Sequence, residues 1–281
     1  MRVAAIELFV NVAHSNGGDD GSAIRAAIQG DPSRREKLVL AALEKAVEEK
    51  PDVILCPGWT FVGRHPAPQL LRKSAGQATV IFEVFPRKNR MALGAPAKGK
   101  DATEGNIDGR VDWATYVLEG GRIRAIPRQV FIFSSDLNEI TGAQFTRALL
   151  KRRIGHGIVL VCGEVNVVRR RKEQDRIRHY WDPRAETART ELKDLVVFNP
   201  AHAPNSSYVR TKRRKGPWRA LVSTSNRLDR RTLSKRSNLP APAHAVVKGH
   251  DRMPSNVAKL DGDESRVLFY DLPDELGPGK D

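Results

Sequence analysis

Short runs of β-branched residues alternate along the chain with segments in which apolar residues recur every three or four positions. The first pattern is typical of buried strands and the second of amphipathic helices. Because the two kinds of segment follow one another from end to end, the pattern predicts an α/β fold of sheets covered by helices. The predicted strands are 2–10, 52–56, 79–85, 91–96, 113–118, 122–126, 157–162, 195–198, 218–224 and 266–270, and the predicted helices are 69–75, 142–151, 169–189 and one that begins at Ser33 and ends before Pro51.

The segment before Pro51 carries a clear helical pattern. Ser33 is its expected N-cap, and a loop rich in glycine and aspartate, 16–22, comes before it. One face is apolar and the opposite face is charged, so we expect the helix to pack on a sheet. The apolar face consists of Leu40, Leu43 and Val47, and the solvated face of Arg35, Glu44, Glu48 and Lys50.

The composition is that of one folded unit. Hydrophobic residues make up 40% of the 281 residues and are spread along the chain, so we expect a single domain over 1–272 and a flexible tail over 273–281. The sequence has no signal-peptide pattern and no apolar stretch of roughly 18 residues, which predicts a cytoplasmic protein without a membrane span. The two cysteines, Cys56 and Cys162, are too few for a disulfide framework and have no zinc-ligand spacing.

The chain is strongly basic. Its 48 Lys and Arg residues against 33 Asp and Glu residues give a formal net charge of +15, which would attract a polyanion. Much of this charge lies in three clusters, 169–172, 210–215 and 227–236. No P-loop, zinc-finger or RNA-recognition signature accompanies them. A solvated rim or a patch for an acidic partner is therefore favoured over nucleic-acid binding, which stays open.

Cys162 occupies a position that suits a nucleophile. It ends the apolar strand 157–161 and is followed by Gly163. In an α/β fold the strand fixes such a side chain, the turn exposes it, and nearby N–H groups can hold an oxyanion. The alternative is that Cys162 is simply a small buried hydrophobe, as free cysteines frequently are. Cys56 also ends a strand, but Pro57 follows it and makes it a weaker candidate.

Several stretches occur in an order that resembles one family. They are 2–7, 52–58, 120–133, 157–164, 194–200 and 218–226. In order and spacing they resemble the carbon–nitrogen hydrolases, the nitrilase and amidase family, over about 1–273. The resemblance implies a four-layer α-β-β-α sandwich, no metal or organic cofactor, and a homodimer or larger homo-oligomer. It also implies a Glu–Lys–Cys triad of general base, oxyanion stabiliser and nucleophile.

The chain departs from that triad at two positions. Cys162 matches the family's cysteine, but Gly58 stands at the position of the glutamate and Arg128 at that of the lysine. Glycine cannot accept a proton, so a thiol with a pKa near 8.5 would be mostly protonated at neutral pH unless another group lowers its pKa. Arg128 can stabilise a thiolate or an oxyanion, but it cannot deliver a proton as lysine can.

Two carboxylates are candidates for the missing base. Glu139 corresponds to an auxiliary glutamate of the family, although it can equally mark the start of a helix. Glu164 follows Cys162 closely, and its alternative role is to bind loop amides. Either carboxylate can act as a base only if the fold brings it within about 3 Å of the sulfur.

The substrate pocket is expected to involve Gly58, Trp59, Gly163 and His202. His202 lies in the loop that lines the family's pocket, where it can bind substrate, shuttle a proton or be an ordinary polar loop residue. Trp59 and Phe61 are expected to fill the space of the missing glutamate. The sequence thus predicts a cysteine-dependent hydrolase of a non-peptide C–N bond in a small-molecule amide or nitrile. The alternative is a catalytically impaired relative that binds a ligand, a protein partner or nucleic acid through its basic surface.

Overall fold

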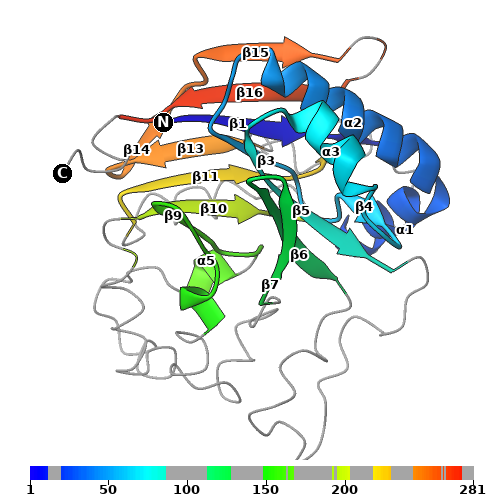
Figure 1. Ribbon diagram of the computed structural model, residues 1–281, viewed down its shortest axis with the longest axis horizontal. Helices are drawn as coiled ribbons and strands as arrows, with labels where there is room; N and C mark the ends of the chain where they lie inside the picture. The colour runs from blue at the N-terminus through cyan, green and yellow to red at the C-terminus, as the bar shows by residue number, and fades with distance from the viewer. Residues whose placement is uncertain are drawn as a thin grey trace, which may run out of the picture.

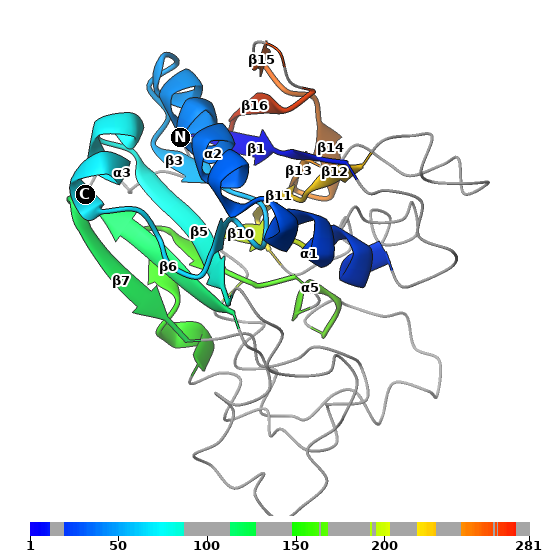
Figure 2. The same cartoon turned by 90° about the vertical axis from the view of Figure 1, so that its right-hand side faces the viewer.

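The structure, a computed structural model, describes residues 1–11, 20–86, 113–127, 148–162, 164–167, 192, 195–202, 218–228, 243–260, 262 and 264–273. Within these ranges the chain forms two large β-sheets and a two-stranded one, with helices packed against them (Figures 1 and 2). The helices are α1 (Asp20–Gly30), α2 (Pro32–Val47), α3 (Pro68–Ala75) and α5 (Glu164–Val167).

The first sheet has eight strands in the order β15-β16-β1-β3-β5-β6-β7, with β4 beside β5. Strands β1, β3 and β5 are parallel, and β16 and β6 flank them as antiparallel neighbours. The strands are β1 (Arg2–Glu7), β3 (Val53–Leu55), β4 (Phe61–Val62), β5 (Thr79–Phe85), β6 (Ala114–Glu119), β7 (Arg122–Ile126), β15 (Asn256–Lys259) and β16 (Arg266–Asp271).

The second sheet has six strands in the order β14-β13-β11-β10-β9-β8, of which β9, β10 and β11 are parallel. A small sheet pairs β12 with β2 in parallel. The strands are β8 (Arg153–Ile154), β9 (Gly157–Val159), β10 (Val196–Pro200), β11 (Ala220–Thr224), β13 (His244–Val247) and β14 (His250–Arg252) in the second sheet, and β2 (Phe9–Val10) and β12 (Arg227–Leu228) in the small one.

Three apolar clusters define the order of the layers. On β1, Val3 and Ala5 face the second sheet, where they meet Val159, Phe198 and Val222. Because side chains alternate along a strand, the intervening residues of β1 face the other way and pack under α2 and α3. A third cluster joins the outer face of the second sheet to Leu149, Val165 and Leu192. The α/β fold with an α-β-β-α order of layers, predicted from the sequence, is thereby confirmed.

Most predicted elements that fall within the described residues are confirmed. The prediction of 79–85 coincides with β5, and β6 and β7 form the predicted hairpin around Gly120 and Gly121, which have φ values of 52° and 76°. The single predicted strand 2–10 is instead divided into β1 and β2, which join different sheets. The predicted strand 91–96 and helix 169–189, together with most of 142–151, lie outside the described residues.

The structure corrects three expectations about α1 and α2. Asp31, and not Ser33, caps α2, because its carboxylate accepts the Arg34 amide N–H at 3.0 Å and Pro32 occupies the first turn. The predicted loop 16–22 also overlaps α1, which begins at Asp20. Arg35 was expected in solvent but is 5% exposed, because its guanidinium binds buried carbonyl oxygens beside the site described below.

Candidate active site

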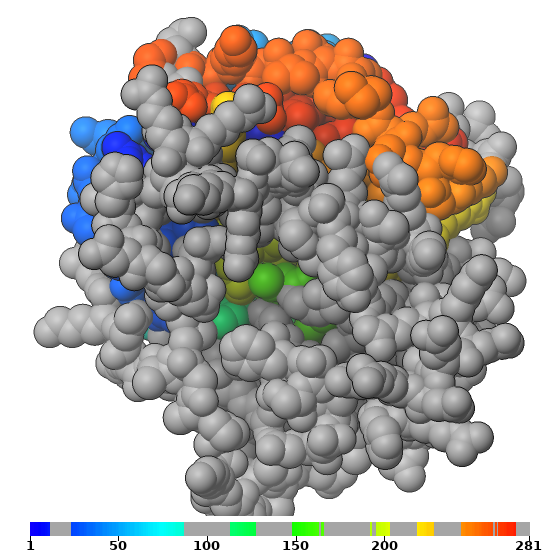
Figure 3. All heavy atoms as spheres, turned by 180° about the vertical axis from the view of Figure 1, so that it is seen from behind, coloured from blue at the N-terminus to red at the C-terminus, as the bar shows by residue number. Residues whose placement is uncertain are grey.

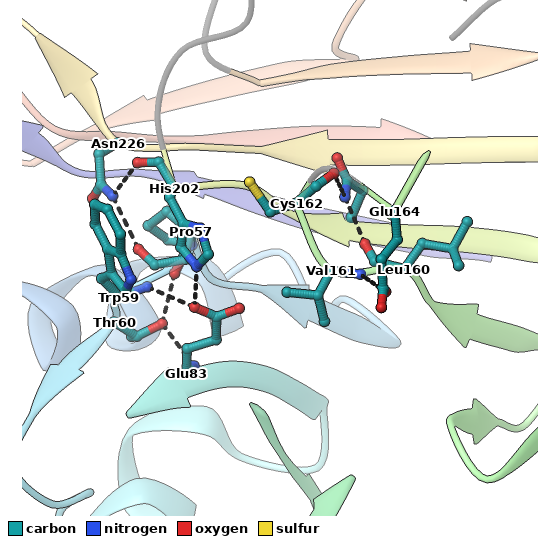
Figure 4. Close-up of polar contacts among 12 residues, drawn as sticks. Pro57, Trp59, Thr60, Glu83, Leu160, Val161, Cys162, Glu164, His202 and Asn226 are labelled. Carbon is teal, nitrogen blue, oxygen red and sulfur yellow. Dashed lines mark hydrogen bonds and ion pairs between the residues drawn. The ribbon is translucent and has the colours of Figure 1, made fainter. Parts of the chain in front are cut away.

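The candidate site lies where parallel strands of both sheets end. The turn after β3 carries Gly58 and Trp59, the turn after β9 carries Cys162, and the turn after β10 carries His202 (Figure 4). Main-chain hydrogen bonds join these turns to one another, since the amide of Gly58 donates to Ala201 at 2.9 Å. The carboxyl ends of parallel strands are the usual place for a site in α/β proteins.

Cys162 is held in a strained turn. Its φ of 40° lies in the left-handed region, which a residue with a Cβ enters at a cost of about 1–3 kcal/mol. Its amide donates to the carbonyl of Pro200 at 2.9 Å, and its carbonyl accepts the side-chain amide of Asn199 at 3.2 Å. The side chain is half-buried. The second sheet therefore fixes the backbone of Cys162 on both sides of the sulfur-bearing carbon.

His202 is the ring that faces Cys162. Its Nε2 lies 2.8 Å from Oε2 of Glu83, and the same oxygen accepts the backbone amide of Trp59 at 2.9 Å. The indole of Trp59 stacks on the imidazole, with ring centroids 4.4 Å apart and planes at 15°, and Trp113 meets it edge-on at 4.6 Å. With Nε2 engaged by the carboxylate, the remaining ring nitrogen is the one available to the sulfur (Figure 4).

The electrostatics couple these three side chains. Burial is the largest influence on His202 and lowers its pKa, but the negative charges of Glu83 and Cys162 and hydrogen bonds to both outweigh it and raise the pKa to about 10. Burial likewise raises the pKa of Cys162, yet the charge of His202 and hydrogen bonds from its ring and backbone lower that pKa below the ordinary value. Each side chain thus favours the charged form of the other, the thiolate of Cys162 and the imidazolium of His202.

Gly58 makes room for His202. A Cβ on Gly58 would lie 2.3 Å from Cδ2 of His202, which is closer than atoms can approach. The ring of His202 therefore occupies the space into which a side chain at position 58 would project. Asn226 holds the arrangement from behind, because its side-chain amide donates to the carbonyls of Gly58 at 2.9 Å and His202 at 2.8 Å.

A buried guanidinium anchors the same turn. Arg35 of α2 donates to the carbonyls of Trp59 and Thr60, each at 3.1 Å, and to Oδ1 of Asn226 at 2.6 Å. These bonds hold Trp59 at a φ of 56°, the second left-handed residue of the site. The stacked indole, and with it the ring of His202, is thus positioned by contacts that reach back to the outer helical layer.

The carboxylate of Glu164 binds Arg152 and the loop, and is not directed toward the sulfur of Cys162 as a base would be. Both of its oxygens bind the guanidinium of Arg152, at 2.5 and 3.1 Å, and one also accepts the amide of Val161 at 2.9 Å. Figure 4 shows its carboxylate on the side of the turn away from the Cys162 sulfur. The structure therefore gives Glu164 the alternative arrangement, a carboxylate that binds the loop, with a buried cation as its partner.

The other residues predicted for the site have different outcomes. Trp59 and His202 do meet at the site, but Phe61 packs under the helices against Phe82 and does not fill the space at Gly58. That expectation is corrected, because Phe61 points to the outer, helix-covered face of the sheet. The imidazole of His202 fills the space instead. Arg128, Glu139 and Gly163 lie outside the described residues.

Glu83 is the residue that the sequence interpretation missed. It is fully buried in β5, within the run Thr79–Phe85, in which every other residue except the first is apolar. A single carboxylate inside a buried strand is costly unless it has a specific partner. That isolated charge was the available signal, but its partner, 119 positions away, could not be read from the pattern.

Cys56 provides an internal contrast. It is fully buried under the helical layer, and burial, only partly opposed by the charge of Arg35, raises its pKa to about 12. A buried thiol with a raised pKa and a half-buried thiol with a lowered pKa therefore follow two different strands. Within the described ranges, no group of three or more His, Cys, Asp or Glu side chains is arranged to hold a metal, and none of the described helices could span a membrane.

Comparison with known proteins finds solved structures that are distant in sequence. No family model matches the chain, and no curated protein matches it either. Among solved structures, the chain is similar to a mutant of the amidase from Nesterenkonia sp. AN1 that shows Michael addition of acrylamide at the active-site cysteine, at 13% identity and a TM-score of 0.48, over 100% of this chain and 96% of that one. The Nesterenkonia amidase belongs to the nitrilase superfamily, the family that the sequence resembles.

A second similar structure is the glutamine-dependent NAD(+) synthetase from Cytophaga hutchinsonii. It is 10% identical with a TM-score of 0.48, and the match covers 97% of this chain and 43% of that one. Such distant matches say nothing about individual side chains. The roles of Cys162, His202 and Glu83 therefore rest on the geometry of this chain.

Proposed function

We propose that this protein is a cysteine-dependent hydrolase of a non-peptide C–N bond, with Cys162 as nucleophile, His202 as acid and base, and Glu83 as the group that orients His202. The observation that carries the proposal is the buried chain of contacts from Glu83 through the imidazole to the sulfur. A base oriented by a third group and placed against a nucleophile is the arrangement that activates serine and cysteine in unrelated folds.

The reaction would proceed in two halves. The Cys162 thiolate attacks the carbonyl carbon of an amide, and the imidazolium of His202 gives a proton to the nitrogen as the C–N bond breaks, which releases an amine and leaves a thioester. The imidazole, now neutral, then takes a proton from water. The resulting hydroxide displaces the thiolate, so the acid leaves and the thiolate–imidazolium pair is restored.

This scheme explains how a chain without the family's glutamate can still activate its cysteine. Gly58 cannot act as a base, but its missing side chain admits His202, which can. Histidine both accepts and donates a proton, so it covers the proton transfers of both halves. We propose that Glu164 supports the turn of Cys162 through Arg152, since both of its oxygens are already engaged.

We also propose roles for the predicted site residues outside the described ranges, together with a substrate class. Arg128 stays our proposed partner of the oxyanion, and Glu139 and Gly163 stay proposed neighbours of the pocket. A small amide is the favoured substrate class. A cytoplasmic location and a homodimer or larger homo-oligomer are also still predictions, with no contact in the described structure that bears on them.

Thiol labelling combined with hydrolysis tests the proposal. Iodoacetamide at pH 7 should label Cys162 about a hundredfold faster than Cys56, because only Cys162 carries a lowered pKa and partial exposure. Ammonia release from short primary amides should disappear in Cys162→Ala, whereas Cys56→Ala should retain it. Slow, equal labelling of both cysteines without hydrolysis would instead support the alternative, a catalytically impaired binding protein.

Nucleic-acid binding is the other outcome that the test must separate. Of the three basic clusters, 169–172 and 210–215 lie outside the described residues, and only the first two residues of 227–236 lie within them. Titration of a fluorescent DNA or RNA oligonucleotide at two salt concentrations measures this function directly, because phosphate contacts weaken as salt rises.

A further inference from the structure

Several buried polar atoms around His202 lack a hydrogen-bond partner in the described part of the chain. They include one oxygen of Glu83 and the hydroxyl of Thr115, both on side chains that are fully buried. The indole nitrogens of Trp59 and Trp113 belong to the same group. Folded proteins rarely leave such groups unpaired, because burial removes their hydration without replacement. Unpaired groups that gather beside a reactive pair indicate the place of a ligand.

The strand register explains why these atoms gather. Glu83 of β5 and Thr115 of β6 are directly opposite each other, so their side chains lie on the same face. Ile81 and Val117, two positions away on the same strands, pack in the core between the two sheets. Because side chains alternate along a strand, Glu83 and Thr115 point into that same space. Trp113, two residues before Thr115, reaches the edge of the His202 ring from there.

The two oxygens of Glu83 are therefore not equivalent. Oε2 is occupied by His202 and by the amide of Trp59. Oε1 has no such partner, and Figure 4 shows it pointing away from the imidazole. The charge of this carboxylate still acts on the sulfur, since it is among the influences that raise the pKa of Cys162. Oε1 is thus an open acceptor on the carboxylate whose other oxygen binds the ring that faces the nucleophile.

The strands that carry these groups are visible together from one side. In Figure 3, atoms with the colours of the chain around β9, β10 and β6 lie near one another on the face opposite to that of Figure 1. The half-buried side chain of Cys162 follows β9, and Thr115 lies on β6. A small molecule bound to these strands would meet both the nucleophile and the unpaired hydroxyl.

We propose that Oε1 of Glu83 and the hydroxyl of Thr115 form a subsite for the nitrogen of a primary amide, which makes the enzyme selective for unsubstituted amides. This inference rests on the proposed function. A primary amide has two N–H hydrogens, and the subsite offers two acceptors on adjacent strands. An ester has no N–H in the corresponding place, and an N-methyl amide loses one N–H and brings a methyl group toward the aromatic rings. A site built around hydrogen bonds discriminates strongly against ligands that cannot make them.

The test compares amide and ester substrates with the same acyl group. Values of kcat/KM are measured for propionamide, N-methylpropionamide and p-nitrophenyl propionate with the wild-type protein and Thr115→Val. The ratio of amide to ester kcat/KM should fall about tenfold or more in Thr115→Val, because the variant removes an acceptor of the amide N–H. The wild type should also prefer propionamide to its N-methyl derivative by about tenfold or more.

The melting temperature of Thr115→Val is a second measurement. A hydroxyl with a structural partner would stabilise the fold, so its loss would lower Tm, whereas loss of an unpaired hydroxyl should raise it. Thr115→Val removes an unpaired buried hydroxyl, so its Tm should rise by about 2 °C or more. The matched control is Thr224→Val, because the Thr224 hydroxyl is also buried but binds the carbonyl of Ile6. That control should lose stability and keep the wild-type ratio of amide to ester turnover.

The outcomes separate the two proposals. A wild-type protein that hydrolyses neither amide nor ester overturns the proposed function itself. If the wild type hydrolyses both, but Thr115→Val lowers both kcat/KM values by the same factor or leaves both unchanged, the subsite is overturned while the hydrolase stands. A lowered Tm for Thr115→Val would also contradict the inference, because it would show that the hydroxyl has a structural partner.

Discussion

Two fully buried glutamates flank the candidate site, and their surroundings differ in kind. Glu164 stands two positions after Cys162, and its oxygens are saturated by the guanidinium of Arg152 and the amide of Val161. Glu83 stands in a different sheet, yet it binds the histidine that faces the sulfur, and one of its oxygens is unpaired. A saturated buried carboxylate holds the fold together, whereas a partly unsatisfied one is available for chemistry.

Glu164 is close to Cys162 in sequence, but this closeness does not direct its carboxylate toward the sulfur. A turn that follows a strand carries its neighbours to opposite sides, so the carboxylate next to the cysteine in sequence is directed into the loop. The carboxylate that binds the ring facing the sulfur comes from another sheet.

Loss of the saturated carboxylate should affect stability first. Glu164→Ala leaves the fully buried guanidinium of Arg152 without its counter-charge, which is expected to lower the free energy of unfolding by about 3–5 kcal/mol. Urea denaturation followed by tryptophan fluorescence measures this change. The double variant Arg152→Met with Glu164→Leu should recover much of the loss, since it removes both charges. A Glu164→Ala protein of wild-type stability but without activity would reassign Glu164 as the base.

Loss of the imidazole should affect the thiol. The positive charge of His202 lowers the pKa of Cys162, so His202→Ala should raise that pKa and reduce iodoacetamide labelling at pH 7 about a hundredfold. From pH 7 to 9 the wild-type rate should rise less steeply than that of the variant, because His202 lowers the pKa of Cys162 in the wild type. The variant's rate should instead rise about tenfold per pH unit in that range. A variant that labels like the wild type would show that another group activates Cys162.

A side chain at Gly58 should disturb the site without removing any functional group. In Gly58→Ala the new methyl group would push on the His202 ring, from which a Cβ would be only 2.3 Å away, and amide turnover should fall about tenfold. The matched control is Gly30→Ala at the end of α1, where a Cβ would meet no atom within 4 Å. Steady-state kinetics of both variants suffice. Equal activities would contradict the idea that Gly58 exists to admit His202.

The fold was largely predictable because its signals are local. The apolar run 79–85 predicted β5 with its correct ends, and Gly120 with Gly121 predicted the hairpin, since each pattern acts within a few residues. Where long-range pairing decides, prediction failed. The run 2–10 was divided because Phe9 and Val10 pair with β12 and not with β16, and no local pattern contains that choice.

By itself, the sequence determined the layered α/β architecture, the strand-end position of Cys162 and the absence of a base at Gly58. It placed His202 near the pocket as one of several interpretations. Only the tertiary structure decided that His202 fills the space at Gly58, that Glu83 is its partner and that Glu164 is occupied by Arg152. The physical reason is that periodicity records which face of an element is buried, whereas a catalytic contact depends on which residues from distant strands meet in the same few ångströms.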